Sequence, residues 1–249
     1  MTAILRRNAP FWISIACGIA LWEIAGRSTS AAFMVPFSAT MLRLWQLIVS
    51  DQFVEQFFDS ARLFLTGFVI ALIVGAPLGL LLARVRPLRV GIEPYIMTLY
   101  ATPMVALIPF ILSLMGFGFA PKVLVVFLFA VFPVLYNTVE GARSIKPELI
   151  EVAKSYRSSE WALWRDVMLP YTLPYTMTGV RQSIGRALVG MVAAEFFLSS
   201  TGLGQLIMGA SQNFDTGGVF ASISVIGVIG VLLMRLGLMI EQHFARWRQ

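Results

Sequence analysis

The chain has 249 residues, of which 58% are hydrophobic and only 13% are charged, and its mean hydropathy is +0.80. A soluble domain is typically a little under half apolar, so this composition excludes a soluble globular protein and indicates a protein of the lipid bilayer. The net charge is +6. Because the basic residues are spread over several loops and do not gather with exposed aromatic residues, they do not indicate nucleic-acid binding.

The N-terminal apolar stretch, Phe11 to Gly26, is short for a membrane span and follows Arg6 and Arg7. One interpretation is a retained first helix. A basic start, an apolar run and the small residues from Ser28 to Ala32 are also typical of a cleavable signal peptide, which would leave five spans. The mass of the intact protein distinguishes these two interpretations.

Six stretches are apolar enough to cross about 30 Å of hydrocarbon, which takes roughly 20 helical residues. They comprise residues 11–26, 61–83, 90–115, 121–142, 175–200 and 218–240. We therefore expect an all-α integral membrane protein with six transmembrane helices in a single domain, residues 1–249. A further amphipathic helix is predicted from Ala39 to Val49, along the outer membrane interface.

Lys and Arg residues are distributed unevenly among the loops. If both termini are cytosolic, the outer segments carry only Arg27, Arg43 and Lys122, and the inner segments carry most of the other basic residues. This asymmetry is typical of the positive-inside rule. It predicts two cytosolic termini and places the polar segment after the fourth span in the cytosol.

Prolines interrupt several predicted spans, and the third span alone contains Pro94, Pro103 and Pro109. Each proline removes a backbone hydrogen bond, and such a loss survives in a membrane only beside neighbouring helices or a water-filled cavity. Simple kinks explain each proline taken singly. A gated path near Thr102, Pro103 and Pro109 is the functional alternative.

The charged segment between the fourth and fifth spans predicts two short surface helices. Apolar residues recur at three- and four-residue intervals between Pro147 and Tyr156, which indicates the first helix. Ser158 or Ser159 is a suitable N-cap for the second, and Pro170 is expected to end it.

This segment, residues 147–170, resembles the EAA loop of permease subunits of ATP-binding-cassette importers. That loop reads Glu-Ala-Ala, three residues, Gly, nine residues, then Ile-x-Leu-Pro. Glu151, Ala153, Leu169 and Pro170 match it, whereas Arg157 stands at the position of the Gly. Either the turn at Arg157 is not left-handed, or Arg accepts a strained conformation at a cost of about 1 kcal/mol.

The resemblance extends to nearly the whole chain, from Trp12 to Trp247. The stretches Ser60–Ala83 and Gly185–Ile207 are similar to the helices that flank this loop in the nitrate, sulfonate and taurine branch of the family. Small residues in the first of these stretches recur at intervals of four or eight, as expected where helix backbones approach closely. We expect packing within the subunit there, with a dimer seam as the alternative; the residues are Gly67, Gly75, Gly79 and Ala83.

The resemblance implies the type I importer permease fold, with a cytosolic coupling helix between the fourth and fifth spans, in a prokaryotic cytoplasmic membrane. It implies two copies of the chain, or this chain and a related permease, with a cytosolic ATPase and an extracytoplasmic substrate-binding protein. ATP and Mg are expected in the ATPase, and this chain is expected to bind no cofactor. The residues expected to contact the ATPase are Glu151, Ala153, Tyr156, Arg157, Leu169 and Pro170.

Charged residues within the fifth predicted span are the remaining candidates for function. Arg186, with Gln182 one turn before it, is placed to face a pathway for an anionic solute; a structural pair with a neighbouring helix is the alternative. Arg181 lies near the cytosolic end and is expected to snorkel. With Thr102 and Pro103 these two residues, Arg186 and Gln182, form the candidate pathway. The family branch implies a small organic or inorganic anion such as a sulfonate, taurine or nitrate.

Catalytic motifs are missing from the sequence. None of the lysines follows a glycine, so the chain has no phosphate-binding loop of its own and cannot be its own ATPase. A single histidine and a single cysteine give little support to metal sites or nucleophilic catalysis. We therefore expect a non-enzymatic subunit. The alternatives are a structural or assembly membrane protein and a secondary transporter or channel that is not coupled to ATP; internal repeats, typical of secondary transporters, are not evident.

Overall fold

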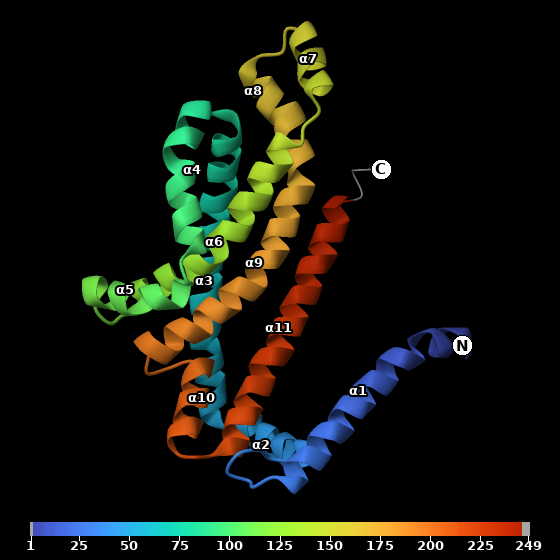
Figure 1. Cartoon of the computed structure of the whole chain (residues 1–249), viewed down its shortest axis with the longest axis vertical. Coiled ribbons are helices and arrows are strands. Elements are labelled where there is room, and N and C mark those ends of the chain that lie inside the picture. The colour runs from blue at the N-terminus through green and yellow to red at the C-terminus, as the bar shows by residue number, and fades with distance from the viewer. Residues whose placement is uncertain (1, 246–249) are drawn as a thin grey trace. The chain divides into compact units, whose positions relative to one another are not determined.

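A computed structural model describes residues 2–245 of the chain, and the side chains of residues 9–243. No strand occurs among these residues, which form a series of helices (Figure 1). The elements in chain order are α1 (Thr2–Ser28), α2 (Phe37–Val49), α3 (Asp51–Arg84), α4 (Arg86–Ala101), the 3-10 helix η1 (Met104–Leu107), α5 (Ile108–Met115), α6 (Phe119–Arg143), α7 (Pro147–Ser155), α8 (Glu160–Leu163), the π-helix η2 (Trp164–Met168), α9 (Leu169–Leu198), α10 (Leu203–Gln212) and α11 (Thr216–Ala245).

Four of the described helices are each long and apolar enough to cross a membrane. They are Ala9–Ser28, Asp51–Arg84, Phe119–Arg143 and Thr216–His243. Two further spans are possible if bent pairs are counted as one: α4 with η1 and α5, bent by 97°, and Glu160–Leu198 with α10, bent by 51°. The described part of the chain therefore provides four to six spans. Four basic residues used to predict the orientation lie outside the described side chains: Arg6, Arg7, Arg246 and Arg248.

The third predicted span, residues 90–115, is not one continuous helix. α4 ends at Ala101, and Thr102 is extended with a ψ of 132°. This conformation is the one preferred before a proline, and Pro103 has no N–H group with which to continue the helix. The apolar stretch therefore turns sharply at the position where the sequence offers a break in the helix.

The chain divides into two compact units. One comprises the chain up to Phe58 together with Thr201–Val228, and the other comprises Asp59–Ser200 and the chain from Ile229 onwards. In the first unit, the indole of Trp22 lies 5.4 Å from the ring of Phe37 and 5.6 Å from that of Phe220. Arg43 of α2 is paired with Asp215 at 2.8 Å. The predicted amphipathic helix is confirmed as α2, which includes Ala39 to Val49.

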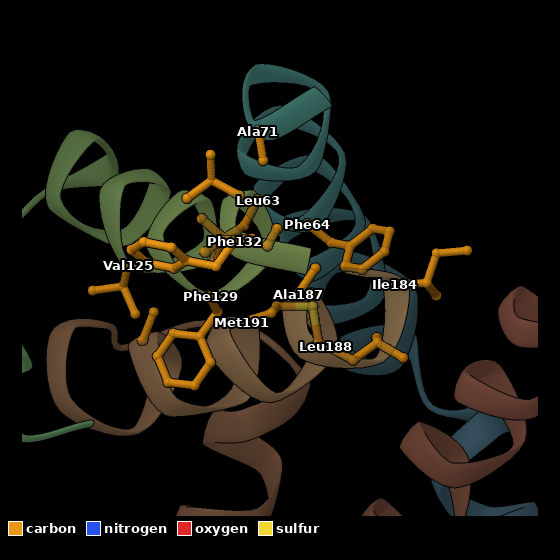
Figure 2. Packing of buried hydrophobic residues seen from close by; sticks show 14 of the residues in the cluster. Leu63, Phe64, Ala71, Val125, Phe129, Phe132, Ile184, Ala187, Leu188 and Met191 are labelled. Carbon is orange, nitrogen blue, oxygen red and sulfur yellow. The ribbon is translucent and has the colours of Figure 1, made fainter. Parts of the chain in front are cut away.

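The second unit contains the core, which is built mainly by α3, α6 and α9. Figure 2 shows buried side chains of these three helices converging, among them Leu63 from α3, Phe129 from α6 and Met191 from α9. Ala71 and Ala187 have no exposed surface at all. Because lipid is as apolar as these side chains, close van der Waals contact is what favours this arrangement over contact with lipid.

Small residues allow α3 to approach α6 closely. A Cβ atom on Gly67 would lie 2.6 Å from Val126 Cβ, and one on Gly75 would lie 3.1 Å from the carbonyl oxygen of Val131. The glycines at these positions therefore pack within the chain, as their spacing predicts, and are occupied by contacts with α6. The same device recurs between α9 and α6, where a Cβ on Gly190 would lie 2.9 Å from Phe129 Cβ.

Candidate functional site

The loop between α6 and α9 begins with a short exposed helix, α7. The prediction of a helix beginning at Pro147 is confirmed, and the helix extends to Ser155. Several of its apolar side chains face solvent: Leu149 is 42% exposed, Val152 is 55% exposed, and Tyr156, just after the helix, is 83% exposed. Glu151 is also exposed, while Ala153 is partly buried. A short helix that exposes large apolar side chains is suited to binding another protein.

The turn after α7 is left-handed, and Arg157 is the residue that adopts this conformation, with a φ of 54°. The amide of Arg157 donates to the carbonyl of Lys154 at 2.9 Å, and that of Ser158 donates to the carbonyl of Ala153 at 3.1 Å. These two bonds form a Schellman motif, a helix ending in which Gly is the usual residue at the left-handed position. Of the two possibilities that the sequence left open, Arg157 therefore takes the strained conformation.

The second helix of the loop begins where it was predicted. Ser159 is its N-cap, and the Ser159 Oγ accepts a hydrogen bond from the amide of Ala162 at 3.2 Å. Glu160 follows, and both of its carboxylate oxygens accept from Nη2 of Arg84 at the end of α3, at 3.2 and 2.9 Å. Arg84 lowers the pKa of Glu160, first through this hydrogen bonding and then through its charge.

Pro170 does not end this helix, contrary to the sequence prediction. α8 continues through the π-helix η2 into α9, so the chain is helical from Glu160 to Leu198. In η2 the amide of Leu169 donates to the carbonyl of Trp164, five residues earlier. The wider π turn shifts the carbonyl groups that a proline ring would meet in an α-helix, and Pro170 then falls in the first turn of α9, where it is tolerated.

A cavity of about 330 Å³ lies at the break between α4 and α5. Three of the four candidate pathway residues, Thr102, Pro103 and Arg186, line it. The other lining residues are Tyr100, Ala101, Met104, Val105, Leu128, Phe129, Phe132 and Pro133. The cavity has the size of a small-molecule site, and it combines mostly apolar walls with one cation.

Arg186 supplies that cation. Among the described side chains no carboxylate lies within 4.0 Å of its guanidinium group. Gln182 does not line the cavity; it accepts a hydrogen bond from Asn137 Nδ2 at 3.2 Å. An arginine with no carboxylate of the described residues beside it, next to a cavity of this size, can attract an anion.

The other charges of α9 have partners within the chain. Arg181 forms an ion pair with Glu241 of α11, which also accepts from Thr178 Oγ1 at 2.7 Å. The expectation that Arg181 simply snorkels was wrong, because a carboxylate far away in the sequence lies beside it. Glu195 is 1% exposed and accepts a hydrogen bond from Ser60 of α3 at 2.5 Å.

These observations define a multi-pass membrane protein with an exposed helical loop and a cavity at a broken span, which is the class of membrane transport proteins. A family model described as "Binding-protein-dependent transport system inner membrane component" matches residues 71–246. The chain therefore belongs to this family, the permeases of type I ATP-binding-cassette importers.

Relatives agree with this assignment, and a solved structure has a similar fold. The chain is 32% identical over 232 residues to the putative aliphatic sulfonates transport permease protein SsuC of Bacillus subtilis, covering 92% of this chain and 84% of that one. It is 35% identical over 232 residues to the riboflavin transport system permease protein RibX of Chloroflexus aurantiacus, covering 92% and 86%. An inward-facing structure of the MetNI methionine ABC transporter resembles its fold, with a TM-score of 0.67, 16% identity and coverage of 77% and 95%.

Proposed function

We propose that this chain is the translocating subunit of an ATP-driven importer of a small anionic solute, with ATP hydrolysed by a separate cytosolic subunit. The observation that carries the proposal is the exposed apolar surface of α7 and the residue that follows it, formed by Leu149, Val152 and Tyr156. In this function α7 is the coupling helix and its exposed face enters a cleft of the ATPase. The Schellman turn at Arg157 and the cap at Ser159 hold α7 beside the helix that continues into α9.

The transport step follows from this connection. When ATP closes the ATPase dimer, α7 moves with it, and the rigid helix that begins at Glu160 transmits the movement to the cavity beside Arg186. The free energy of ATP binding thereby shifts a two-state equilibrium between inward-open and outward-open forms of the permease. The chain itself is non-catalytic in this scheme and binds no cofactor; ATP and Mg are bound by the ATPase.

The complete assembly would contain two permease chains in a prokaryotic cytoplasmic membrane and an extracytoplasmic binding protein that delivers the solute. In this arrangement each chain has six spans, the two bent pairs counting as one span each, and both termini and α7 are cytosolic. We propose that all 249 residues form one transmembrane permease domain. Sulfonates, and smaller anions such as nitrate, are the solutes that best fit one arginine in a cavity of about 330 Å³.

The decisive experiment is purification of the tagged chain in mild detergent from cells that also express the ATPase of the same transport system. The proposal expects the two proteins to co-purify in a one-to-one ratio and to hydrolyse ATP. A permease that purifies alone, and catalyses uptake in liposomes without ATP, would instead be a secondary transporter or channel.

A further inference from the structure

An ion pair joins the loop after α6 to the end of α3. Nη2 of Arg84, the last residue of α3, donates to both carboxylate oxygens of Glu160, at 3.2 and 2.9 Å. Glu160 is the first residue of α8. Because the guanidinium group contacts both oxygens, the pair restrains the orientation of the carboxylate as well as its distance.

This pair contributes little to the stability of the fold. The side chain of Glu160 is 69% exposed and that of Arg84 is 32% exposed. Ion pairs so accessible to water are weak, because solvent screens them and both side chains lose conformational freedom. Any importance of the pair therefore depends on which parts of the molecule it connects.

The two partners lead to two different parts of the wall of the cavity at Arg186. From Arg84 the chain turns at Val85 into α4, which ends at Ala101 in the wall formed by residues 100–105. From Glu160 the chain is helical up to Leu198, and this helix carries Arg186. The wall with Arg186 is thus connected covalently to Glu160, and the α4 wall is connected to it through Arg84. A second ion pair, between Glu93 of α4 and Arg143 at the end of α6, ties α4 to the other end of the loop.

We propose that the Arg84–Glu160 ion pair makes the α4 wall of the cavity move together with the Arg186 wall when the ATPase moves the loop. The inference rests on the proposed function and names two positioning residues for it, neither of which contacts solute or ATP. With the pair broken, the loop still carries α9, but α4 is tied to the loop only through Glu93 and Arg143 and follows it less completely. The cavity then opens unevenly, and ATP is hydrolysed without full transport.

Separate reporters on the two walls test this inference without knowledge of the solute. In a Cys17→Ser background, which removes the chain's only cysteine, one cysteine is placed at Val105 or at Val189. Val105 lines the α4 side of the cavity, and Val189 is one turn beyond Arg186 on the same face of α9. The rate of labelling by a charged maleimide is measured in the assembled permease–ATPase complex, without nucleotide and after trapping with ATP and vanadate.

In the otherwise unchanged complex, trapping is expected to change the labelling rate at both positions by about fivefold or more. Arg84→Glu or Glu160→Arg should reduce the response at Val105 and leave the response at Val189. The double exchange, Arg84→Glu with Glu160→Arg, should restore both. As a matched control, Asp166→Asn breaks the 2.7 Å pair with Arg165, which lies wholly within the loop, and should leave both responses unchanged.

A full response at Val105 in either single variant would overturn the inference, and so would a double exchange that fails to restore it. If the reversed charges prevent assembly, Arg84→Gln, Glu160→Gln and the variant with both changes form a double-mutant cycle. Additive effects of the two changes on the response at Val105 would contradict the pair's role. Non-additive effects would support it. Failure of the proposed function looks different, because trapping would then change labelling at neither position in the complex with Arg84 and Glu160 intact.

Discussion

Gly79 of α3 lies directly against Thr138 of α6, so closely that a Cβ atom on Gly79 would be 2.8 Å from the Cβ of Thr138 and 2.8 Å from the carbonyl oxygen of Leu135. Neither the backbone carbonyl of Leu135 nor the β-branched side chain of Thr138 can make room for this atom unless one of the two helices moves. Gly79→Ala is therefore expected to destabilise the protein by about 1–3 kcal/mol, the usual cost of an overfilled core.

Gly91 of α4 provides the matched control for that substitution, because a Cβ atom there would meet nothing within 4 Å. Gly91→Ala should leave the melting temperature unchanged or raise it, since Ala favours a helix by about 1 kcal/mol over Gly. Thermal unfolding of the detergent-solubilised protein, followed by tryptophan fluorescence, measures both variants. Equal melting temperatures for the two variants would contradict the close contact between α3 and α6.

Arg157→Gly is expected to stabilise the loop. Arg157 has a φ of 54°, and relief of the strain at Cβ is worth about 1 kcal/mol. Arg157→Ala keeps the Cβ atom and should give no gain, which makes it the control. The measurement is proteolysis or hydrogen exchange of the loop in the isolated permease. A loop that becomes less protected in Arg157→Gly would argue that the Arg side chain contributes more than its conformation costs.

The same Arg157→Gly variant tests contact with the ATPase. If the guanidinium group pairs with carboxylates of the ATPase, as we propose, the ratio of ATPase to permease after purification falls even though the loop is more stable. An unchanged ratio would remove this contact role.

Ala153→Trp is expected to uncouple ATP hydrolysis from transport. Ala153 is the small residue on the face of α7 that we assign to the ATPase cleft, and an indole there overfills the cleft. Lys154→Trp places the same ring on the opposite face of α7, away from Leu149 and Val152, and serves as the control. Glu151→Lys tests whether Glu151 pairs with a basic residue of the ATPase. Uptake and ATPase assays in proteoliposomes measure all three variants, and normal uptake with Ala153→Trp would refute the assignment of α7 as coupling helix.

Arg186→Gln should abolish uptake of an anionic solute and leave assembly intact, because no described carboxylate within 4.0 Å depends on Arg186 for its charge. Arg186→Lys keeps the charge and should retain part of the uptake. Size-exclusion chromatography and uptake are scored separately. A complex that dissociates in Arg186→Gln would indicate a structural role instead.

The charge on Glu160 should persist in mildly acidic solution. Arg84 lowers its pKa from the ordinary value of 4.5. The pairing is therefore fully present above about pH 4.5 and is lost only as the pH falls through the lower folded-state pKa. A titration of carbon-13-labelled glutamate followed by NMR should show Glu160 below its ordinary value, and Arg84→Gln should return it toward that value. A Glu160 pKa that is the same with and without Arg84 would contradict the ion pair.

Local features of the loop were accessible from the sequence, because each depends on a few neighbouring residues. The cap at Ser159 and the start of α7 at Pro147 follow from side-chain chemistry next to a periodic pattern. The break at Thr102 was harder to predict. Hydropathy shows that residues 90–115 are apolar, but it does not show whether the helix axis changes direction within them. A proline is compatible with a kink, a turn or an unbroken helix. Pro103 ends a helix, whereas Pro170 is carried through a π turn, and nothing in the local sequence distinguishes the two.

Contacts between distant residues could not be predicted from the sequence. Arg181 and Glu241 belong to different helices, and only the packing of α9 against α11 brings them together. The same holds for the cavity, in which Arg186 lies beside residues 100–105. A charged residue such as Arg186 is costly in a membrane, which the sequence alone indicates, but its position beside the break after α4 depends on the fold.

The unbroken helix from Glu160 to Leu198 connects the loop to the cavity. It also fixes the direction in which Arg186 points around the helix axis. An α-helix turns by about 100° per residue, so one residue inserted between Tyr171 and Gly185 would rotate Arg186 by that angle about the helix axis, out of the cavity, without changing any side chain there. An insertion at Ser158, in the irregular chain between α7 and α8, would leave the direction of Arg186 unchanged. Among permeases that share this architecture, the residue count from Glu160 to Arg186 is therefore expected to stay constant.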